Sequence, residues 1–320
     1  MIRRWDFDAA LLAAAAARGV EIRQDLAATR YEVGRDGVVL HTTRGPITAA
    51  VLVGADGAGG VVRKQLLAET LGRRRAEPRP IRLFRAELPA PPGRFATTML
   101  YDFSPMATGL RGYLWIFPMP SGGINVGLMH YPSEHSPRSG KQLVKILAEW
   151  LRPHGVELDG SERGWPVLGY DPTLPLARPR VLLVGDAAGV DALTGEGIAV
   201  GMEQAAVAGE TIVEALASGD FSLRGYTRRV RRAPVGRELV LDGRLARMLY
   251  DGDAYRRWLS LVLFDEQMLR LYADRVAGQL VLADERRALV GALLRHLWKW
   301  GERRRRLDGL DQGLAREPAL

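Results

Sequence analysis

The chain has 320 residues, of which 47% are hydrophobic and 26% charged, and these proportions exclude a wholly disordered protein. It contains no cysteine, which excludes disulfide scaffolds, thiolate metal sites and cysteine nucleophiles and fits a reducing cytoplasm. The formal net charge is +8, with arginine runs at 73–75, 228–229, 231–232 and 303–306. Such runs are most simply solvated helix faces. Attraction to an anionic membrane surface or ligand stays open, and no basic motif interleaved with aromatic residues indicates nucleic-acid binding.

The N-terminal stretch MIRRWDFDAALLAAAAARG has the outline of a signal peptide, because two arginines precede an alanine run. Asp6 and Asp8 interrupt the part that should be apolar, and alanine has little membrane affinity. We therefore predict an amphipathic helix from about Asp6 to Arg18, ended by Gly19. No stretch of the sequence reaches the ~20 apolar residues of a membrane-spanning helix.

The following segments predict mixed strand and helix. Residues 20–24 and 37–57 have strand composition, and the second segment turns at 44–46 before the apolar run 51–53. Residues 61–72 predict a helix closed by Gly72, and the Arg- and Pro-rich stretch 73–80 predicts a crossing between domains.

The central part predicts β-structure and the last part helices. Residues 81–88 predict a strand, 112–131 a hairpin that turns at 120–123, and 139–151 a helix. A strand at 181–186 precedes a helix at 198–217, with Thr194 as its cap and Gly219 as its stop. From residue 225 onward the apolar spacing is helical to the end of the chain.

The segment VLLVGDAAGVDALTGEGIAVGMEQA, residues 181–205, places a glycine-rich loop between a strand and a helix. Residues 185–197 supply backbone with little side-chain bulk, and the helix that begins near Gly197 points its free N–H groups at the loop. Such a helix end favours a phosphate or a developing negative charge. Asp186 is suited to accept hydrogen bonds from ribose or ribityl hydroxyls. Taken alone, the pattern also fits a purely structural turn.

Four motifs in order resemble those of FAD-dependent oxidoreductases of the aromatic-hydroxylase type. GDAAG…LTGEGI at 185–198 is similar to their second flavin motif, and RWDFDAALLAAAAARGVEI at 4–22 to their Arg-x-x-Phe-Asp helix. VLVGADGAGGVVRKQL at 51–66 resembles their Gly-Ala-Asp-Gly motif, although Gly60 stands where serine is common. GYLWIFP at 112–118, followed by NVG at 125–127, resembles the Tyr-x-Trp-x-Phe-Pro motif of the geranylgeranyl reductase branch.

The resemblance implies an α/β fold in which a Rossmann-like FAD-binding domain is interrupted by an antiparallel β-sheet substrate domain and followed by a helical C-terminal region. The FAD-binding domain then takes residues 1–72 and 171–220, the substrate domain 73–170 and the helical region 221–320. The family's Gly-x-Gly-x-x-Gly fingerprint is absent, and GADGAGG at 54–60 has the wrong spacing. We therefore expect the first βαβ unit upstream of Met1, beside the strand at 181–186, lost through a mis-called start, a split gene that encodes it separately, or gene decay.

The resemblance also implies roles for individual residues. Arg4 would reach the phosphate or ribityl region of FAD, and Asp186 would hold its ribityl or pyrophosphate end. Gly197 and Ile198 would offer N–H groups to the pyrimidine edge of the flavin ring. The remaining cofactor-binding candidates are Ala28, Asp56, Gly57, Gly185 and Gly195.

The substrate candidates are Tyr113, Trp115, Phe117 and Pro118, which the resemblance places beside a lipid tunnel. The first three alternate onto one face of a strand, so plain core of the β domain is the competing interpretation. The five histidines, at 41, 130, 135, 154 and 296, have no ligand spacing, and we assign no metal. We name no catalytic residue, because the cofactor itself carries the redox chemistry of such enzymes.

The implied activity is reduction of C=C double bonds in a geranylgeranyl-type polyprenyl lipid, with FAD as cofactor and NADPH or another reductant as electron donor. A flavin monooxygenase or halogenase of the same fold is one alternative, although halogenases carry Trp-x-Trp-x-Ile-Pro where this chain has YLWIFP at 113–118. An inactive remnant or interaction protein is the other. The lipid substrate, together with Trp258, Leu259, Trp298 and Trp300 among the C-terminal arginines, predicts peripheral, salt-sensitive association with the inner face of an anionic membrane.

Overall fold

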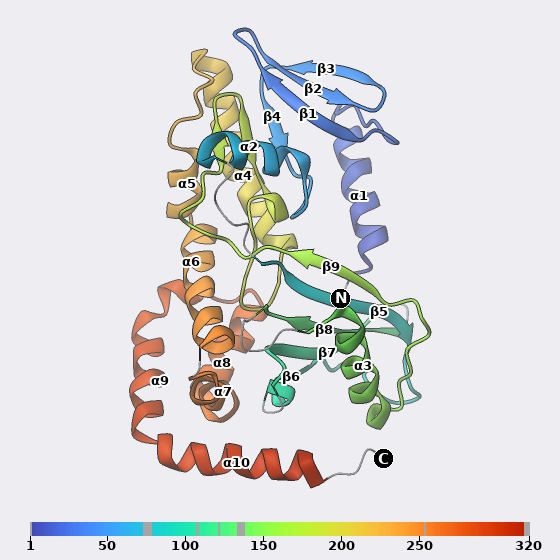
Figure 1. Ribbon diagram of the computed structural model, residues 1–320, viewed down its shortest axis with the longest axis vertical. Helices are drawn as coiled ribbons and strands as arrows, with labels where there is room; N and C mark the ends of the chain where they lie inside the picture. The colour runs from blue at the N-terminus through green and yellow to red at the C-terminus, as the bar shows by residue number, and fades with distance from the viewer. Residues whose placement is uncertain are drawn as a thin grey trace.

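The computed structural model describes residues 2–72, 79–106, 109–120, 122–132, 138–252 and 254–316, with side chains up to 309. Figure 1 shows an elongated molecule with a small β-sheet at one end, a larger sheet in the other half, and helices along one side. Three parts of the predicted elements lie outside the described chain: residues 73–78 of the predicted crossing at 73–80, residue 121 of the predicted hairpin turn, and the last four residues.

The N-terminal part begins with helix α1 (Arg4–Ala16), which Gly19 follows with a φ of 86°. The prediction of a strand at 20–24 is wrong, because the exposed side chains there face no partner strand. The first strand is β1 (Ala28–Val33), which pairs with β2 (Val38–Thr42) and then β3 (Gly45–Ala49) in an antiparallel sheet. Tyr31 is buried on this sheet and donates its hydroxyl to Glu69 of the next helix, α2 (Val61–Leu71).

A second small sheet joins segments that are far apart in the sequence. Its order is β10 (Ala177–Arg178), β11 (Val181–Leu183) and β4 (Leu52–Gly54), and β11 runs parallel to β4. Within this chain both edges of β11 are therefore occupied, and the expectation of a further strand upstream of Met1 stays a prediction. Among the described strands of this sheet, β10 and β4 are the outer ones, and the edge of β4 that faces away from β11 has no partner strand.

The larger sheet is antiparallel, in the order β6-β7-β8-β5-β9. Its hairpin, β7 and β8, forms as predicted because alternate residues of both strands are apolar on each face. Helix α3 covers one face with Leu143, Leu147 and Leu151, and it begins at Ser139, whose side chain and that of Gln142 cap the helix reciprocally. The strands are β5 (Ile81–Pro89), β6 (Leu100–Asp102), β7 (Gly112–Pro118), β8 (Gly123–His130) and β9 (Arg163–Val167), and the helix is α3 (Gly140–Leu151).

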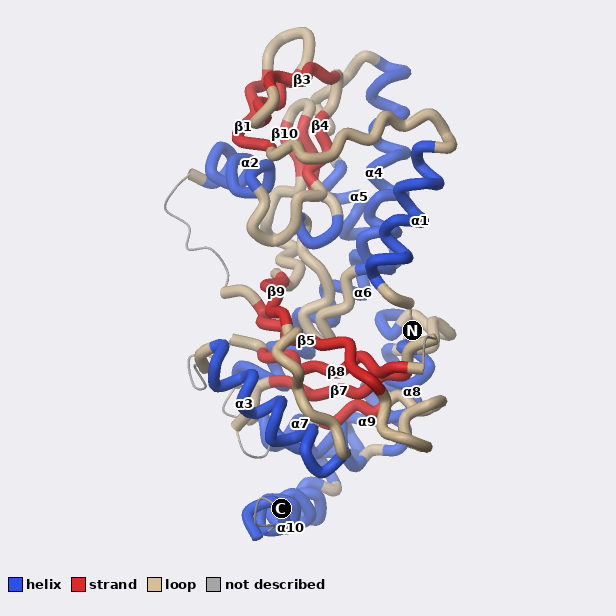
Figure 2. Tube along the Cα trace, turned by 90° about the vertical axis from the view of Figure 1, so that its right-hand side faces the viewer, coloured by secondary structure: helices blue, strands red, loops and turns tan. Residues whose placement is uncertain are grey.

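Helices of the second half cover the other face of this sheet and extend beyond it, as Figures 1 and 2 show. They are α4 (Ile198–Ser218), α5 (Tyr226–Arg232), α6 (Pro234–Ala246), α7 (Tyr255–Phe264), α8 (Glu266–Val276), α9 (Arg286–Trp298) and α10 (Trp300–Arg316). The prediction of helices from 225 onward is thus confirmed over the described residues. The prediction that Leu259 faces a membrane is wrong, because Leu259 is fully buried; Trp258 and Trp300 are half-buried and Trp298 is exposed.

Candidate functional site

The glycine-rich loop leaves the sheet where β4 and β11 end side by side. Leu183 pairs with Gly54 in the parallel register, so the segments after both strands start from the same edge. After β11 the chain makes a single 3-10 turn, Gly185–Ala187, and then a loop that reaches α4. Gly189 has a φ of +97°, and a Cβ there would lie 2.8 Å from Cα of Tyr170. The backbone at residue 189 therefore lies closer to the backbone of Tyr170 than a residue with a side chain would allow.

A buried glutamine braces the start of this loop. The Gln204 side chain accepts a hydrogen bond from the N–H of Gly185 at 2.7 Å and donates one to the carbonyl of Gly189 at 3.1 Å. Sequence analysis missed it, although a signal was present: Gln204 shares the buried face of α4 with Ala208, Thr211 and Ala215. A buried amide needs hydrogen-bond partners, and the adjacent loop backbone supplies them.

The N-terminus of α4 points into the loop without a side-chain cap. Gly197 is the N-cap residue, and the first intrahelical bond runs from the N–H of Gly201 to its carbonyl. In the described part of the chain, the N–H groups of residues 198–200 have no hydrogen-bond acceptor. The predicted cap is wrong, because Thr194 donates its hydroxyl to Asp191 instead. A 21-residue helix with free N–H groups and no acidic residue in its first turn attracts negative charge.

Asp186 lies against this helix end. A Cβ on Gly197 would come within 2.9 Å of Oδ1 of Asp186, and no described residue donates a hydrogen bond to this half-buried carboxylate. Burial raises the pKa of Asp186 and the charge of Arg4 lowers it, so Arg4 of α1 lies within electrostatic reach. Arg4 itself forms an ion pair with Asp8 at 3.0 Å. The structure therefore brings together Arg4, Gly185, Asp186, Gly197 and Ile198.

The other cofactor-binding candidates have different surroundings. Asp56 accepts a hydrogen bond from the N–H of Val62 at 2.8 Å and so caps α2. A Cβ at residue 60 would lie 2.2 Å from that carboxylate, which explains why Gly60 stands where the related motif carries serine. Gly57, with a φ of 80°, turns the chain between them.

Two candidates remain to be placed. Ala28 lies apart, at the start of β1, where it pairs with Thr42 in the other small sheet. Gly195 lies in the loop, with a φ of 76°, and a Cβ there would lie 3.4 Å from the side chain of Leu83 in β5. Gly195 thus marks the point where the loop meets the larger sheet.

Three side chains, one from the larger sheet and two from the C-terminal helical region, hold the loop from residue 191 to 197. The Tyr113 hydroxyl donates to the carbonyl of Thr194 at 2.6 Å, and the Tyr250 hydroxyl donates to the carbonyl of Leu193 at 2.8 Å. Arg275 of α8 lies 3.4 Å from Oδ2 of Asp191. Asp191, in turn, accepts the backbone N–H of Leu193 at 2.6 Å. The loop is therefore fixed by β7, by the turn after α6, and by α8.

Arg275 belongs to a buried charge cluster. Its guanidinium group lies 2.8 Å from a carboxyl oxygen of Asp242 and 2.8 Å from one of Glu238, in addition to its contact with Asp191. Burial, followed by the charge of Asp191, raises the pKa of Asp242 to about 9, whereas Arg275 lowers it. Asp242 therefore keeps its proton at neutral pH, which reduces the buried negative charge that one guanidinium must balance. Sequence analysis did not name this cluster, because its members come from segments far apart in the chain.

The predicted aromatic face of β7 packs directly beneath the loop. Tyr113 and Trp115 are 5% and 7% exposed, with ring centroids 5.7 Å apart, while Phe117 and Pro118 are half-buried. The rings that join them are Tyr101, Phe103 and Tyr272. The predicted alternation onto one face is confirmed. Tyr113 and Trp115 form a closed wall, and Phe117 keeps more accessible surface.

The NVG motif on β8 is explained by Trp115. The indole N–H of Trp115 donates to Oδ1 of Asn125 at 2.9 Å, and a Cβ on Gly127 would lie 2.2 Å from Cζ2 of the same ring. Asn125 thus orients the indole and Gly127 makes room for it. The two motifs that sequence analysis quoted separately form one packing unit.

Residues 1–241 match the sequence model of a family described as FAD binding domain. A digeranylgeranylglycerophospholipid reductase of Methanothrix thermoacetophila is 33% identical over 133 residues, which are 40% of this chain and 33% of the relative. A menaquinone reductase of Mycolicibacterium smegmatis is 30% identical over 192 residues, 57% of this chain and 45% of the relative. The chain thus spans about a third of the length of the first curated relatives that it matches.

One solved structure has the same fold over nearly the whole chain. It is a geranylgeranyl bacteriochlorophyll reductase-like protein from Thermoplasma acidophilum, with a TM-score of 0.63 at 20% identity, and the match covers 95% of this chain and 74% of that one. The likeness confirms the predicted α/β fold class. The family match agrees with FAD as the predicted cofactor.

Proposed function

Because the chain belongs to the family of FAD-binding domains, we propose that it is an FAD-dependent oxidoreductase that reduces C=C bonds of a geranylgeranyl-type polyprenyl lipid. One observation carries the proposal: the hydroxyl of Tyr113 bonds to the carbonyl of Thr194, so the aromatic wall of β7 and the glycine loop are in direct contact. An apolar aromatic surface suits a hydrocarbon chain better than a polar aromatic substrate. Two relatives, named digeranylgeranylglycerophospholipid reductase and menaquinone reductase, support the substrate class.

The residues of the loop fit FAD. The unpaired N–H groups at the start of α4 offer preorganised donors, which we assign to the pyrimidine edge of the flavin ring. Asp186 has no hydrogen-bond donor within the described protein and is free to accept bonds from ribityl hydroxyls. Arg4, on the same side, supplies a positive charge for the phosphate or ribityl region. Asp56 contributes to cofactor binding indirectly, because its carboxylate caps α2 and is not free to bind FAD.

Bound FAD, reduced by NADPH or another donor, supplies the electron pair for the reduction. The residues of the chain bind and orient the cofactor and the substrate, and they exclude water from the site. Tyr113, Tyr250 and Arg275 keep the loop in one conformation, while Trp115 keeps the wall beneath it dry. In this proposal residues 1–72 and 171–220 hold the cofactor, 73–170 face the substrate, and 221–320 close the site from the other side.

We also propose that the protein acts at a membrane surface, because a polyprenyl lipid resides there. Among the helices that the structure describes, none is long and apolar enough to cross a bilayer. Contact with the membrane would therefore be peripheral, through basic and apolar side chains on the outside of the molecule.

A single-turnover assay tests the proposed reaction. The FAD-loaded protein, reduced anaerobically with dithionite, is mixed with a geranylgeranyl glycerophospholipid or with menaquinone, and the lipids are analysed by mass spectrometry. We expect one of them to gain two hydrogens for each double bond reduced, as the flavin is reoxidised. Incorporation of oxygen or halogen into an aromatic compound under aerobic conditions, with no alkene saturated in either lipid, would contradict the proposal.

A further inference from the structure

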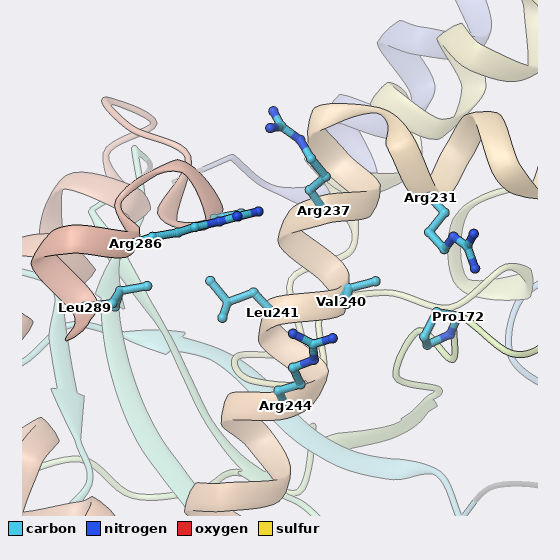
Figure 3. A pocket seen from close by; sticks show the side chains of 9 residues that line it. Pro172, Arg231, Arg237, Val240, Leu241, Arg244, Arg286 and Leu289 are labelled. Carbon is cyan, nitrogen blue, oxygen red and sulfur yellow. The ribbon is translucent and has the colours of Figure 1, made fainter. Parts of the chain in front are cut away.

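A basic groove of about 720 Å³ lies between α6 and α9, away from the glycine loop (Figure 3). Four arginines line it, namely Arg231, Arg237, Arg244 and Arg286, and none of the described residues in its lining is acidic. Arg237 and Arg244 are seven residues apart on α6, which places them on one face of the helix. Leu241 lies between them on the same face and points across the groove toward Leu289 of α9 (Figure 3).

Most of this positive charge is not balanced by the protein. Arg237 forms an ion pair with Asp284 at 2.8 Å. Arg231, Arg244 and Arg286 are exposed and form no ion pair with any residue in the described ranges. The groove thus combines guanidinium groups, which bind phosphate, with apolar side chains, which can contact a hydrocarbon attached to that phosphate.

Helix α9 continues from this groove as an exposed apolar ridge. Val290, Leu294 and Trp298 are spaced four residues apart and are 54%, 62% and 84% exposed. Ala292 and His296 hold the opposite face of the same helix against the molecule. Arg286 and Leu289, near the start of this helix, line the groove, so the ridge follows the groove along α9. Figure 1 shows α9 on the outer side of the molecule. A row of large apolar side chains beside arginines is typical of helices that lie in a membrane interface.

We propose that the α9 ridge and the arginine groove together bind the surface of an anionic phospholipid bilayer. The ridge enters the boundary between headgroups and acyl chains, and the groove receives lipid phosphates. Self-association through this face would bring its unpaired arginines close to those of a second copy, in a chain of net charge +8, so charge complementarity favours the bilayer. The inference goes beyond the proposed reaction and does not depend on it, because it concerns binding alone.

Vesicle co-sedimentation of the full chain tests the groove. We expect strong binding to phosphatidylcholine vesicles that contain phosphatidylglycerol, weak binding to pure phosphatidylcholine, and loss of the difference at high salt. Arg231→Gln/Arg244→Gln/Arg286→Gln is expected to bind about a hundredfold more weakly, since each arginine near the surface contributes about fivefold. The matched control, Arg35→Gln/Arg44→Gln/Arg152→Gln, removes the same charge from exposed arginines elsewhere.

A second pair of variants tests the ridge. Leu294→Gln/Trp298→Gln removes the apolar side chains without a strong helix breaker and is expected to abolish most binding. Val213→Gln/Leu216→Gln on exposed positions of α4 is the control and should bind as the unmodified protein does. Tryptophan emission should shift to the blue on vesicle binding, and Trp298→Phe should remove most of that shift. Circular dichroism melts identify any variant that fails to fold, and Arg244→Gln alone then replaces the triple variant.

Four outcomes would overturn the inference. Equal binding to neutral and anionic vesicles at low salt removes the role of charge, and an equal loss in both arginine variants removes the role of the groove. Binding of inorganic phosphate that the groove variant abolishes, without binding to vesicles, identifies a free-phosphate site. A dimer in analytical ultracentrifugation that the ridge variant dissociates, again without vesicle binding, identifies an interface between copies of the chain.

Discussion

Helix α1 and strand β7 bury their apolar side chains to very different degrees. Helix α1 buries no residue, and Trp5 at its start is 84% exposed. By contrast, residues 112–116 of β7 are all buried, between α3 on one face and the C-terminal helices on the other. The candidate site lies between these regions. Its rigid side is therefore the one built from the larger sheet and the helices that follow it.

This difference explains how the loop is held. Among the described residues outside the loop's own strand and helix, the side chains that hold residues 191–197 by hydrogen bonds or ion pairs are Tyr113, Tyr250 and Arg275, all from the well-packed region. Arg4, on the sparsely packed side, acts on Asp186 through charge, with no hydrogen bond between the two. We infer that the flavin-ring end of the cofactor meets a preformed surface, whereas the end toward Arg4 meets a more adaptable one.

The largest effect is expected from a matched pair of leucines. Leu114→Ala in β7 removes a side chain that is 0% exposed and should lower the free energy of unfolding by about 2–5 kcal/mol. Leu12→Ala in α1, where the side chain is 47% exposed, should change it by about 0.5 kcal/mol or less. Urea denaturation of both variants measures the contrast. Equal losses would mean that α1 is packed against something in solution.

A pH effect is expected from Asp242 in the buried cluster. Its folded-state pKa is raised to about 9, so the folded state keeps a proton that the unfolded state releases above its ordinary, acidic pKa. The stability contributed by the protonated group therefore falls as pH rises across this window, by up to about 1.4 kcal/mol per unit. Asp242→Asn should lack this slope, so its stability relative to the unmodified protein should increase between about pH 5 and about pH 8. Unfolding curves across that range measure the difference, with exposed Asp36→Asn as control. A constant difference would show that Asp242 is ionised in the fold.

Much of the fold was predictable wherever a local pattern determines structure. The hairpin at 112–131 follows from alternating apolar residues, and the helix at 198–217 follows from its alanine-rich run and the glycine after it. The loop between β11 and α4 was also predictable, because glycines and a following helix define it locally. In each case the signal lies within about twenty residues of the feature.

The missed features depend on contacts between distant segments. Thr194 is a residue type that often caps helices, yet its hydroxyl donates to Asp191 instead. Asp191 in turn accepts a hydrogen bond from Arg275, 84 residues further along the chain. The strand predicted at 20–24 instead forms at Ala28–Val33, since that is where β2 and α2 can bury Tyr31. Neither the ion pair nor the strand register leaves a local pattern.

Asp186 should affect cofactor binding more than folding. If its carboxylate accepts bonds from ribityl hydroxyls, Asp186→Ala loses a charge-assisted hydrogen bond of about 1.5–3 kcal/mol, and the Kd for FAD should rise about ten- to a hundredfold. Asp186→Asn keeps one acceptor and should lose less. Fluorescence titration with FAD measures both, and thermal melts without FAD should coincide with that of the unmodified protein. An unchanged Kd for Asp186→Ala would assign the residue to the turn after β11 alone.

The smallest expected effect concerns the free energy of local unfolding of α1. A 13-residue helix in water is marginally stable even when rich in alanine, and α1 gains little from packing because none of its side chains is buried. Its amide hydrogens should therefore exchange with an opening free energy of about 1 kcal/mol or less, whereas those of β7 should approach the free energy of global unfolding. Hydrogen–deuterium exchange with mass spectrometry resolves the two segments in one experiment.

Ion pairing between Arg4 and Asp8 adds only a few tenths of a kcal/mol on an exposed helix, so Asp8→Asn should raise the exchange of α1 slightly and leave β7 unchanged. Protection of α1 equal to that of β7 would show that the exposed Trp5, Leu11 and Leu12 are covered in solution, and the contrast between α1 and β7 would then be lost.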